Sequence, residues 1–369
     1  MESDGSLKAI IKLMTTKCNV SIVENRCFSS YCCHYFNLGS IIVPLLLENW
    51  KRRMLVNKTI DSGQRDEIYV QMMDASPSAL FMKDLYARML LTRIVDEYAW
   101  RMHDLGYIDF NASCRGHEAA QVGSAVCIEV GKDFTLPYYR DLGVMLTIGM
   151  TPYEVFRNYL QIYGCEKSTE QEAILHWGYH KHNTVTGPTP TATQILHAAG
   201  IAFACKLRKA PVVTIAYCSD GVIAEADFRE GIRFAALHQL PVVFVCEHDC
   251  TGTPSASSCM QKIDIPAGLT QRRSDGTDII EVYTTMQAAM RHAREGHGPI
   301  LLELYVTRST PTAHTSLEDD AEDNDPLIRC QRYLQEQGMW DEAWAAQLYT
   351  RYTQEVERAM QDAIRETLQ

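Results

Sequence analysis

The chain has 369 residues, of which 46% are hydrophobic and 22% are charged, a balance typical of a globular protein that can bury a large core. Its formal net charge is −11 and no long basic run occurs, which argues against nucleic-acid binding, because neutralising phosphates requires clustered Lys and Arg. We therefore expect an ordinary globular protein that binds neither nucleic acid nor a membrane.

Residues 1–75 show no helical or strand periodicity, and we expect them to form an atypical extension ahead of one main domain at residues 76–369. The apolar run at residues 41–47 is too short to span a membrane and follows no basic region of a signal peptide. Four cysteines cluster in the extension without Cys-x-x-Cys spacing, so a metal site is the weaker interpretation there. These are Cys18, Cys27, Cys32 and Cys33.

Four helices are predicted in the first part of the main domain. The longest follows Ser78 and is indicated by a stripe of residues at helical spacing. Residues 118–128, 151–163 and 193–206 also have helical character, and Thr151-Pro152 is a good start for the second of these. The stripe of the first helix consists of Leu85, Met89, Thr92, Asp96 and Ala99.

Three histidines between the last two of these helices have a spacing that would suit zinc on a helix. His176 and His180 are four residues apart, with His182 close behind. Glycines and prolines in the same segment predict a loop instead, so we favour a loop that lines a binding site over a zinc site.

The most informative stretch spans residues 211–253, with the sequence PVVTIAYCSDGVIAEADFREGIRFAALHQLPVVFVCEHDCTGT. Residues 212–218 and 242–246 are apolar runs of strand length, and residues 225–237 between them have helical periodicity. Two buried strands joined by a helix form a βαβ unit with parallel strands. Further on, residues 299–306 predict another buried strand, and residues 341–369 predict a long C-terminal helix.

Two acidic residues follow the two strands of this unit. Because parallel strands end at the same edge of a sheet, we expect Asp220 and Asp249 to lie near each other. Two carboxylates at a strand edge beside a helix N-terminus suit a hard cation that bridges to a phosphate. The alternative is that Asp220 is an ordinary turn or N-cap residue and Asp249 an ordinary loop residue.

This stretch resembles the thiamine diphosphate motif of 2-oxo acid dehydrogenase alpha subunits, the decarboxylating component. That motif opens with Gly-Asp-Gly and closes with Asn-Asn, where this chain has Ser219-Asp220-Gly221 and His248-Asp249. Other segments resemble the family in the same order, from about residue 80 to residue 348. They are CRGHEAAQVGSA (114–125), LPYYRDLGVML (136–146), HWGYHKHNTVTGPTPTATQILHAAGIA (176–202), SDGTDIIEVY (274–283), AHTS (313–316) and DPLIRCQRYLQEQGMWDE (325–342).

The resemblance implies an α/β protein with the three-layer α/β/α thiamine diphosphate-binding fold, a mainly parallel sheet and C-terminal helices. It also implies thiamine diphosphate and Mg²⁺ as cofactors. The implied metal ligands are Asp220, Asp249 and the backbone carbonyl of Thr251. The implied cofactor-binding residues are Tyr139 and Arg140 at the diphosphate, Thr189 and Thr191 at the pyrimidine side, and Ser219 and Gly221 in the turn. The resemblance also implies that His314 lies near the thiazolium, where it is the catalytic candidate.

Three departures from the family pattern affect this site. Ser219 replaces the first glycine and adds a Cβ where the backbone approaches phosphate. Asp249 replaces the ligand asparagine and adds a negative charge beside an anionic cofactor. Thr191 stands where the family usually has leucine. We therefore expect cofactor binding to persist but to be weaker than is typical of the family.

The implied function is oxidative decarboxylation of a small 2-oxo acid with acyl transfer to lipoamide, with a branched-chain acid favoured over pyruvate. The implied partners are a beta subunit, in an α2β2 heterotetramer without which the chain is inactive, and a lipoyl acyltransferase core. Cysteines inside apolar runs favour a reducing, cytoplasmic compartment. The alternatives are an acetoin dehydrogenase alpha subunit and a non-catalytic relative that has lost cofactor binding.

Overall fold

The computed structural model describes residues 78–108, 111–164, 177–187, 191–251, 263–308 and 324–367. The chain divides into two units, Met1–Ser76 and Pro77–Gln369, and all described residues belong to the second. The predicted extension at residues 1–75, with its cysteine cluster, lies outside the described residues. Its boundary with the main domain therefore stays a prediction.

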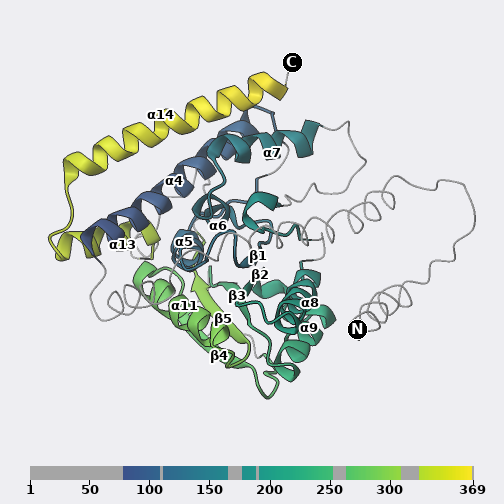
Figure 1. Cartoon of the computed structure of the whole chain (residues 1–369). Coiled ribbons are helices and arrows are strands. Elements are labelled where there is room, and N and C mark those ends of the chain that lie inside the picture. Colours follow the sequence, from purple (N-terminus) through teal and green to yellow (C-terminus); the bar gives the residue numbers. More distant parts are fainter. Residues whose placement is uncertain are drawn as a thin grey trace, which may run out of the picture. The chain divides into compact units, whose positions relative to one another are not determined.

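A parallel five-stranded sheet forms the centre of the described unit (Figure 1). The strand order is β1-β2-β3-β5-β4, and all four neighbouring pairs are parallel. β2, β3 and β5 are buried along almost their whole length, which explains their continuous apolar sequences. The strands are β1 (Phe134–Leu136), β2 (Thr214–Ser219), β3 (Val242–Asp249), β4 (Thr270–Asp275) and β5 (Ile300–Val306).

Helices cover both faces of the sheet and create two separate cores. On one face, α8 (Thr193–Leu207) and α9 (Ala226–Leu237) pack against alternate strand residues such as Phe244. On the other face, α5 (Glu118–Ala125) and α11 (Ile279–Arg294) pack against the intervening strand residues, such as Val243 and Val245. The arrangement confirms the predicted three-layer α/β/α fold with a parallel sheet.

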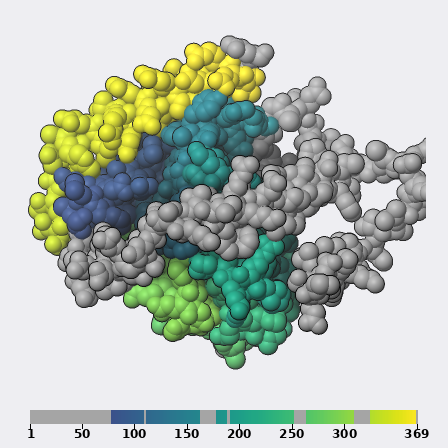
Figure 2. Space-filling model, in the orientation of Figure 1, coloured from purple at the N-terminus to yellow at the C-terminus, as the bar shows by residue number. Residues whose placement is uncertain are grey.

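The remaining helices form an outer shell on the α5 side. α14 (Glu342–Thr367) runs along α4 (Ala79–Asp104) and α7 (Pro152–Gly164), as Figures 1 and 2 show. α13 (Pro326–Glu336) contacts α4 and α5, and the short α6 (Leu142–Thr147) lies between α4 and α5. The C-terminal helices are therefore present as predicted. None of the described helices combines the length and the apolar character that crossing a bilayer requires.

Three of the predicted helices, α4, α7 and α14, begin after a residue whose side chain caps them. The Ser78 hydroxyl accepts a hydrogen bond from the Phe81 amide at the start of α4, and the Thr151 hydroxyl accepts one from the Glu154 amide at the start of α7. The Asp341 carboxylate caps α14 in the same way. The whole predicted stripe of α4 is buried, including the polar Thr92 and Asp96.

A buried ion network joins three of these helices. The Arg93 guanidinium of α4 donates to Glu118 Oε1 at 2.5 Å and to the two carboxylate oxygens of Asp325 at 3.0 and 3.3 Å. Glu118 opens α5, and Asp325 is the N-cap of α13. Burial by itself lowers the pKa of Arg93, but these two carboxylates outweigh it and raise the pKa above its ordinary value. The arginine therefore holds the beginnings of α5 and α13 against α4.

Replacing this arginine should be strongly destabilising. Arg93→Met leaves two buried carboxylates without a counter-charge, and we expect the free energy of unfolding to fall by about 3–5 kcal/mol. Urea denaturation of the purified chain measures this change. Arg101→Met on the same helix is the control, because Arg101 lies 4.0 Å from Glu357 in an exposed pair and its loss should cost less than about 1 kcal/mol. Equal effects of the two substitutions would contradict this role of Arg93.

Candidate functional site

The acidic turn after β2 lies at the carboxyl edge of the sheet, beside the end of β3. β2 ends at Ser219, and the short 3₁₀ helix η3 (Asp220–Val222) follows directly. Ser219 pairs with Glu247 in the β2–β3 register, so Asp220 is one residue beyond this pair and Asp249 is two. The two predicted metal-binding carboxylates therefore follow neighbouring parallel strands at the same edge.

The Asp249 carboxylate already has several partners in this structure. Its Oδ1 accepts hydrogen bonds from the Thr251 amide at 3.0 Å and from the Thr251 hydroxyl, and its Oδ2 lies 3.3 Å from Arg308 Nε. Burial raises the pKa of Asp249, but the Thr251 hydrogen bonds and the Arg308 charge outweigh it and hold the pKa below its ordinary value. Asp249 is therefore an ionised carboxylate beside a cation, Arg308.

The turn itself leaves space for a ligand. A Cβ added at Gly221 would meet only the Ser219 hydroxyl oxygen, at 3.7 Å, so the backbone here can be approached closely. The hydroxyl of Ser219, which replaces the family's glycine, therefore lies beside the Gly221 backbone. This observation fits an anionic group that rests on the turn, with Ser219 as a hydroxyl donor in place of a bare glycine.

The segment after β1 reaches the same edge. Arg140 Nη1 donates to the Ser113 carbonyl at 2.5 Å, and its guanidinium lies 5.3 Å from the centre of the Tyr139 ring. The Trp177 indole donates to the Tyr139 carbonyl at 3.0 Å. The two predicted diphosphate-binding residues are therefore held against the loop that leads into α5.

The two described ends of the predicted pyrimidine-side loop contact β1 and α9. Residues 183–187 run next to β1, where the Val185 amide donates to the Thr135 carbonyl at 2.9 Å. At the far end of the loop, the Thr193 hydroxyl donates to Asp227 in the first turn of α9 at 2.6 Å. Thr191 is half-buried just ahead of α8, whereas Thr189 and His314 lie outside the described residues.

Four buried polar residues at this edge were not predicted as site residues. Glu247 Oε2 lies 2.6 Å from His117 Nδ1, accepts a hydrogen bond from the Tyr138 hydroxyl at 2.9 Å, and lies 3.4 Å from Gln121 Nε2. Gln121 also donates to the Arg140 carbonyl and accepts from the Gly143 amide. We call His117, Gln121, Tyr138 and Glu247 the Glu247 cluster; it joins the start of α5, the segment after β1 and the end of β3.

The off-pattern His248 belongs to the opposite face of the sheet. Its neighbour Glu247 faces α5, and His248 Nε2 lies 3.1 Å from Glu303 Oε2 on β5. Glu303 also contacts Arg273 and Gln271 of β4. Burial raises the pKa of Glu303, but these partners outweigh it and lower the pKa. His248 therefore has a packing partner of its own, away from the Glu247 cluster.

The donor set suits a hard cation only in part. Carboxylate and carbonyl oxygens are the protein ligands that Mg²⁺ prefers, and a bound phosphate and water would complete its shell. Within the described ranges, no group of three His, Cys, Asp or Glu side chains surrounds a metal position. The predicted set of Asp220, Asp249 and the Thr251 carbonyl needs only two side chains, but the nearby Arg308 charge opposes a cation at Asp249.

Two other features do not contribute to this site. In the predicted histidine loop, His180 and His182 lie in the 3₁₀ helix η2 (His180–His182), and the His182 ring packs against Tyr179.

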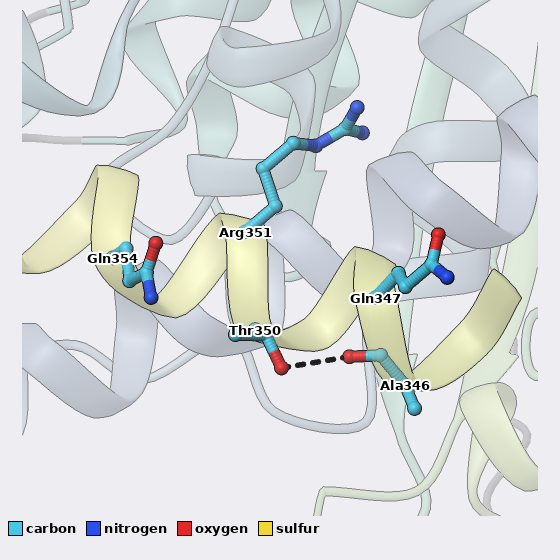
Figure 3. Close-up of a pocket in the computed structure, with 5 residues that line it drawn as sticks. All are labelled: Ala346, Gln347, Thr350, Arg351 and Gln354. Carbon is cyan, nitrogen blue, oxygen red and sulfur yellow. Dashed lines mark hydrogen bonds between the residues drawn. The ribbon is translucent and has the colours of Figure 1, made fainter. Parts of the chain in front are cut away.

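A surface depression of about 350 Å³ is lined by five residues of α14 alone (Figure 3). It has no acidic residue and no wall from another described element. The five residues are Ala346, Gln347, Thr350, Arg351 and Gln354.

The chain is similar to one family of known proteins over most of its length. The family model of the dehydrogenase E1 component matches residues 86–369. The 2-oxoisovalerate dehydrogenase subunit alpha of Bacillus subtilis (strain 168) is 37% identical over 273 residues, covering 69% of this chain and 82% of the relative. The 3-methyl-2-oxobutanoate dehydrogenase subunit alpha of Mycobacterium tuberculosis (strain ATCC 25618 / H37Rv) is 32% identical over 298 residues, with coverages of 76% and 77%. The pyruvate dehydrogenase E1 component subunit alpha of Bacillus subtilis (strain 168) is 29% identical over 300 residues, also with coverages of 76% and 77%.

A buried carboxylate beneath the site gives a pH-dependent prediction. Asp96 of α4 accepts hydrogen bonds from the Ser113 hydroxyl at 2.6 Å and the Cys114 amide at 3.2 Å. Burial outweighs these bonds and raises the pKa of Asp96 from 3.8 to about 6. Folding therefore favours the protonated acid, and this contribution to stability is complete below pH 3.8 and is lost as the pH rises to about 6.

Between about pH 4 and about pH 7, the free energy of unfolding of the wild type should fall by about 2 kcal/mol more than that of Asp96→Asn, because one pKa unit corresponds to about 1.36 kcal/mol. Urea denaturation across this range measures the difference. Asp84→Asn, at a more exposed position of the same helix, is the control. A constant difference between wild type and Asp96→Asn over the whole range would contradict the shifted pKa.

Proposed function

The chain belongs to the dehydrogenase E1 component family, and we propose that it is the alpha subunit of a 2-oxo acid dehydrogenase. The reaction is oxidative decarboxylation of a small 2-oxo acid with transfer of the acyl group to lipoamide. A branched-chain 2-oxo acid is favoured over pyruvate, because the 2-oxoisovalerate relative is 37% identical to this chain and the pyruvate relative 29%.

The observation that carries the proposal is the meeting of predicted residues at one edge of the sheet. The acidic turn at Asp220, the Asp249 loop and the Tyr139–Arg140 segment come from three different parts of the sequence. They follow β2, β3 and β1, which are neighbouring parallel strands. In open α/β sheets, ligands bind at the carboxyl ends of the strands, and a phosphorylated cofactor suits this mixture of carboxylates, a guanidinium and exposed backbone amides.

Each residue has a proposed task at this edge. Asp220, Asp249 and the Thr251 carbonyl hold Mg²⁺, and Arg140 with Tyr139 binds the diphosphate, for which a guanidinium fork is well suited. Ser219 and Gly221 form the floor under it, Thr189 and Thr191 line the pyrimidine side, and His314 lies near the thiazolium. When bound, thiamine diphosphate supplies the carbanion chemistry of decarboxylation, while the protein positions and shields it.

The proposed partners follow from the family. The relatives named above are all alpha subunits. A thiamine enzyme also needs a second domain with a glutamate that activates the aminopyrimidine ring, and we propose that a beta subunit supplies it in an α2β2 heterotetramer. The lipoyl acyltransferase core is the next partner, and we place the assembly in the cytoplasm.

One observation favours a second candidate, a non-catalytic relative that keeps the fold but not the cofactor. Arg308 lies 3.3 Å from Asp249, where the proposed function requires a metal ion. A cation already beside the ligand carboxylate weakens its hold on Mg²⁺. No contact among the described residues favours the acetoin-cleaving alternative, which a product assay with the assembled enzyme would distinguish.

Cofactor titration separates the two candidates. Isothermal titration calorimetry of the chain co-expressed with its beta subunit should show binding of thiamine diphosphate in the presence of Mg²⁺, weaker than in typical members of the family. Asp220→Asn removes a charged metal ligand, and we expect the affinity to fall at least tenfold, or about 1.4 kcal/mol. Glu230→Gln, on an exposed turn of α9, is the control and should bind like the wild type. If the wild type gives no heat at millimolar cofactor, the proposed catalytic function is wrong and the non-catalytic candidate remains.

A further inference from the structure

His117 is buried at the candidate site, and among the described residues only one nitrogen of its ring has a hydrogen-bond partner. It is the N-cap residue of α5, its side chain is 2% exposed, and its Nδ1 lies 2.6 Å from Glu247 Oε2. Its Nε2 has no hydrogen-bond partner among the described residues. A buried polar atom without a partner costs about 1–3 kcal/mol, so each such atom in a native protein requires an explanation.

The surroundings of His117 indicate where this free nitrogen lies. A Cβ at Gly116, which has a φ of +94°, would come within 2.0 Å of the Thr307 carbonyl, so the start of α5 is pressed against the segment that carries Arg308. The charge of His117 also contributes to the lowered pKa of Asp249. His117 is therefore near both Asp249 and the Arg308 segment, at the positive end of the α5 dipole.

We propose that His117 is a further binding residue of this site, whose Nε2–H donates to an oxygen of the cofactor's diphosphate. Glu247 is its positioning residue: the carboxylate accepts the Nδ1–H and fixes the ring, and an imidazolium in this orientation donates from both nitrogens. This inference rests on the proposed function for the identity of the ligand. Its chemistry requires only a diphosphate group at the carboxyl edge.

This role explains why a histidine, a tyrosine and a glutamine all converge on one carboxylate. Tyr138 and Gln121 are the other donors to Glu247 Oε2, and burial together with the Glu247 charge keeps the pKa of Tyr138 well above its ordinary value. The tyrosine is therefore a neutral donor. The cluster holds the imidazole in one orientation, and none of its members forms a hydrogen bond with Nε2.

Two substitutions at position 117 test the proposal, because each retains a hydrogen-bond donor in place of one of the two ring nitrogens. Counted in bonds from Cα, the amide nitrogen of asparagine matches Nδ1, and that of glutamine matches Nε2. His117→Asn therefore retains a donor to Glu247 and loses the proposed donor to the diphosphate. His117→Gln retains the diphosphate donor. His238→Gln, on the far side of the sheet, is the control for a histidine replacement.

The experiment is calorimetric titration of the alpha–beta complex with thiamine diphosphate and, separately, with inorganic pyrophosphate, both with Mg²⁺. We expect His117→Asn to weaken both ligands at least tenfold and His117→Gln to weaken them less than about threefold, an ordering that charge-assisted hydrogen bonds to a phosphate would give. The melting temperature of the unliganded complex should be similar for His117→Asn and the wild type.

Several outcomes would overturn the inference. Wild-type affinity in His117→Asn, or weaker binding by His117→Gln than by His117→Asn, would show that the imidazole serves only the Glu247 contact. If the wild type binds thiamine diphosphate and His117→Asn binds it equally well, the inference fails while the proposed function stands. If the wild type binds pyrophosphate through His117 but not thiamine diphosphate, the inference stands and the proposed function fails. Binding of neither ligand by the wild type overturns both.

Discussion

The buried carboxylate of Glu247 is the contact on which the arrangement of the site depends. It lies near the end of β3 and receives His117 and Gln121 from α5 and Tyr138 from the segment after β1. Burying a polar group costs free energy unless it is hydrogen-bonded, so these three contacts to Glu247 Oε2 fix three segments relative to one another. The Tyr139–Arg140 segment, the start of α5 and the Asp249 loop are thereby brought to one edge of the sheet.

The outer helices hold the same region from behind. Arg93 of α4 binds Glu118, the first residue of α5, and Asp96 of α4 binds the Ser113–Cys114 segment just ahead of it. The Ser113 carbonyl in turn accepts from Arg140. A continuous set of polar contacts thus runs from the outer shell to the proposed diphosphate position. The long α14 packs on α4 and α7 and supports this shell, but it supplies none of these polar contacts.

The sequence predicted the parts of the fold whose own residues specify them. Four elements were predicted close to their observed bounds, because their apolar runs or stripes match the period of a buried strand or helix. They are β2, α9, β3 and β5. β4 was missed because its sequence, TQRRSD, is that of a polar edge strand, paired on one side only. The motif predicted Asp220 and Asp249 together, but it could not reveal Arg308 beside Asp249 or place His248 on the opposite face. The Glu247 cluster was missed because its residues become one site only through contacts between distant segments; the one available signal was a glutamate that ends an apolar strand.

We propose that this carboxyl edge is one half of a thiamine diphosphate site, completed by a beta subunit. Cryo-electron microscopy of the chain co-purified with its beta subunit, thiamine diphosphate and Mg²⁺ tests this proposal. We expect the diphosphate at the turn of Ser219–Gly221, with the metal ion between it and Asp220 and Asp249, and with His117 Nε2 within hydrogen-bonding distance of a phosphate oxygen. An assembled heterotetramer with saturating cofactor and no density at this edge, or with the diphosphate bound elsewhere, would contradict it.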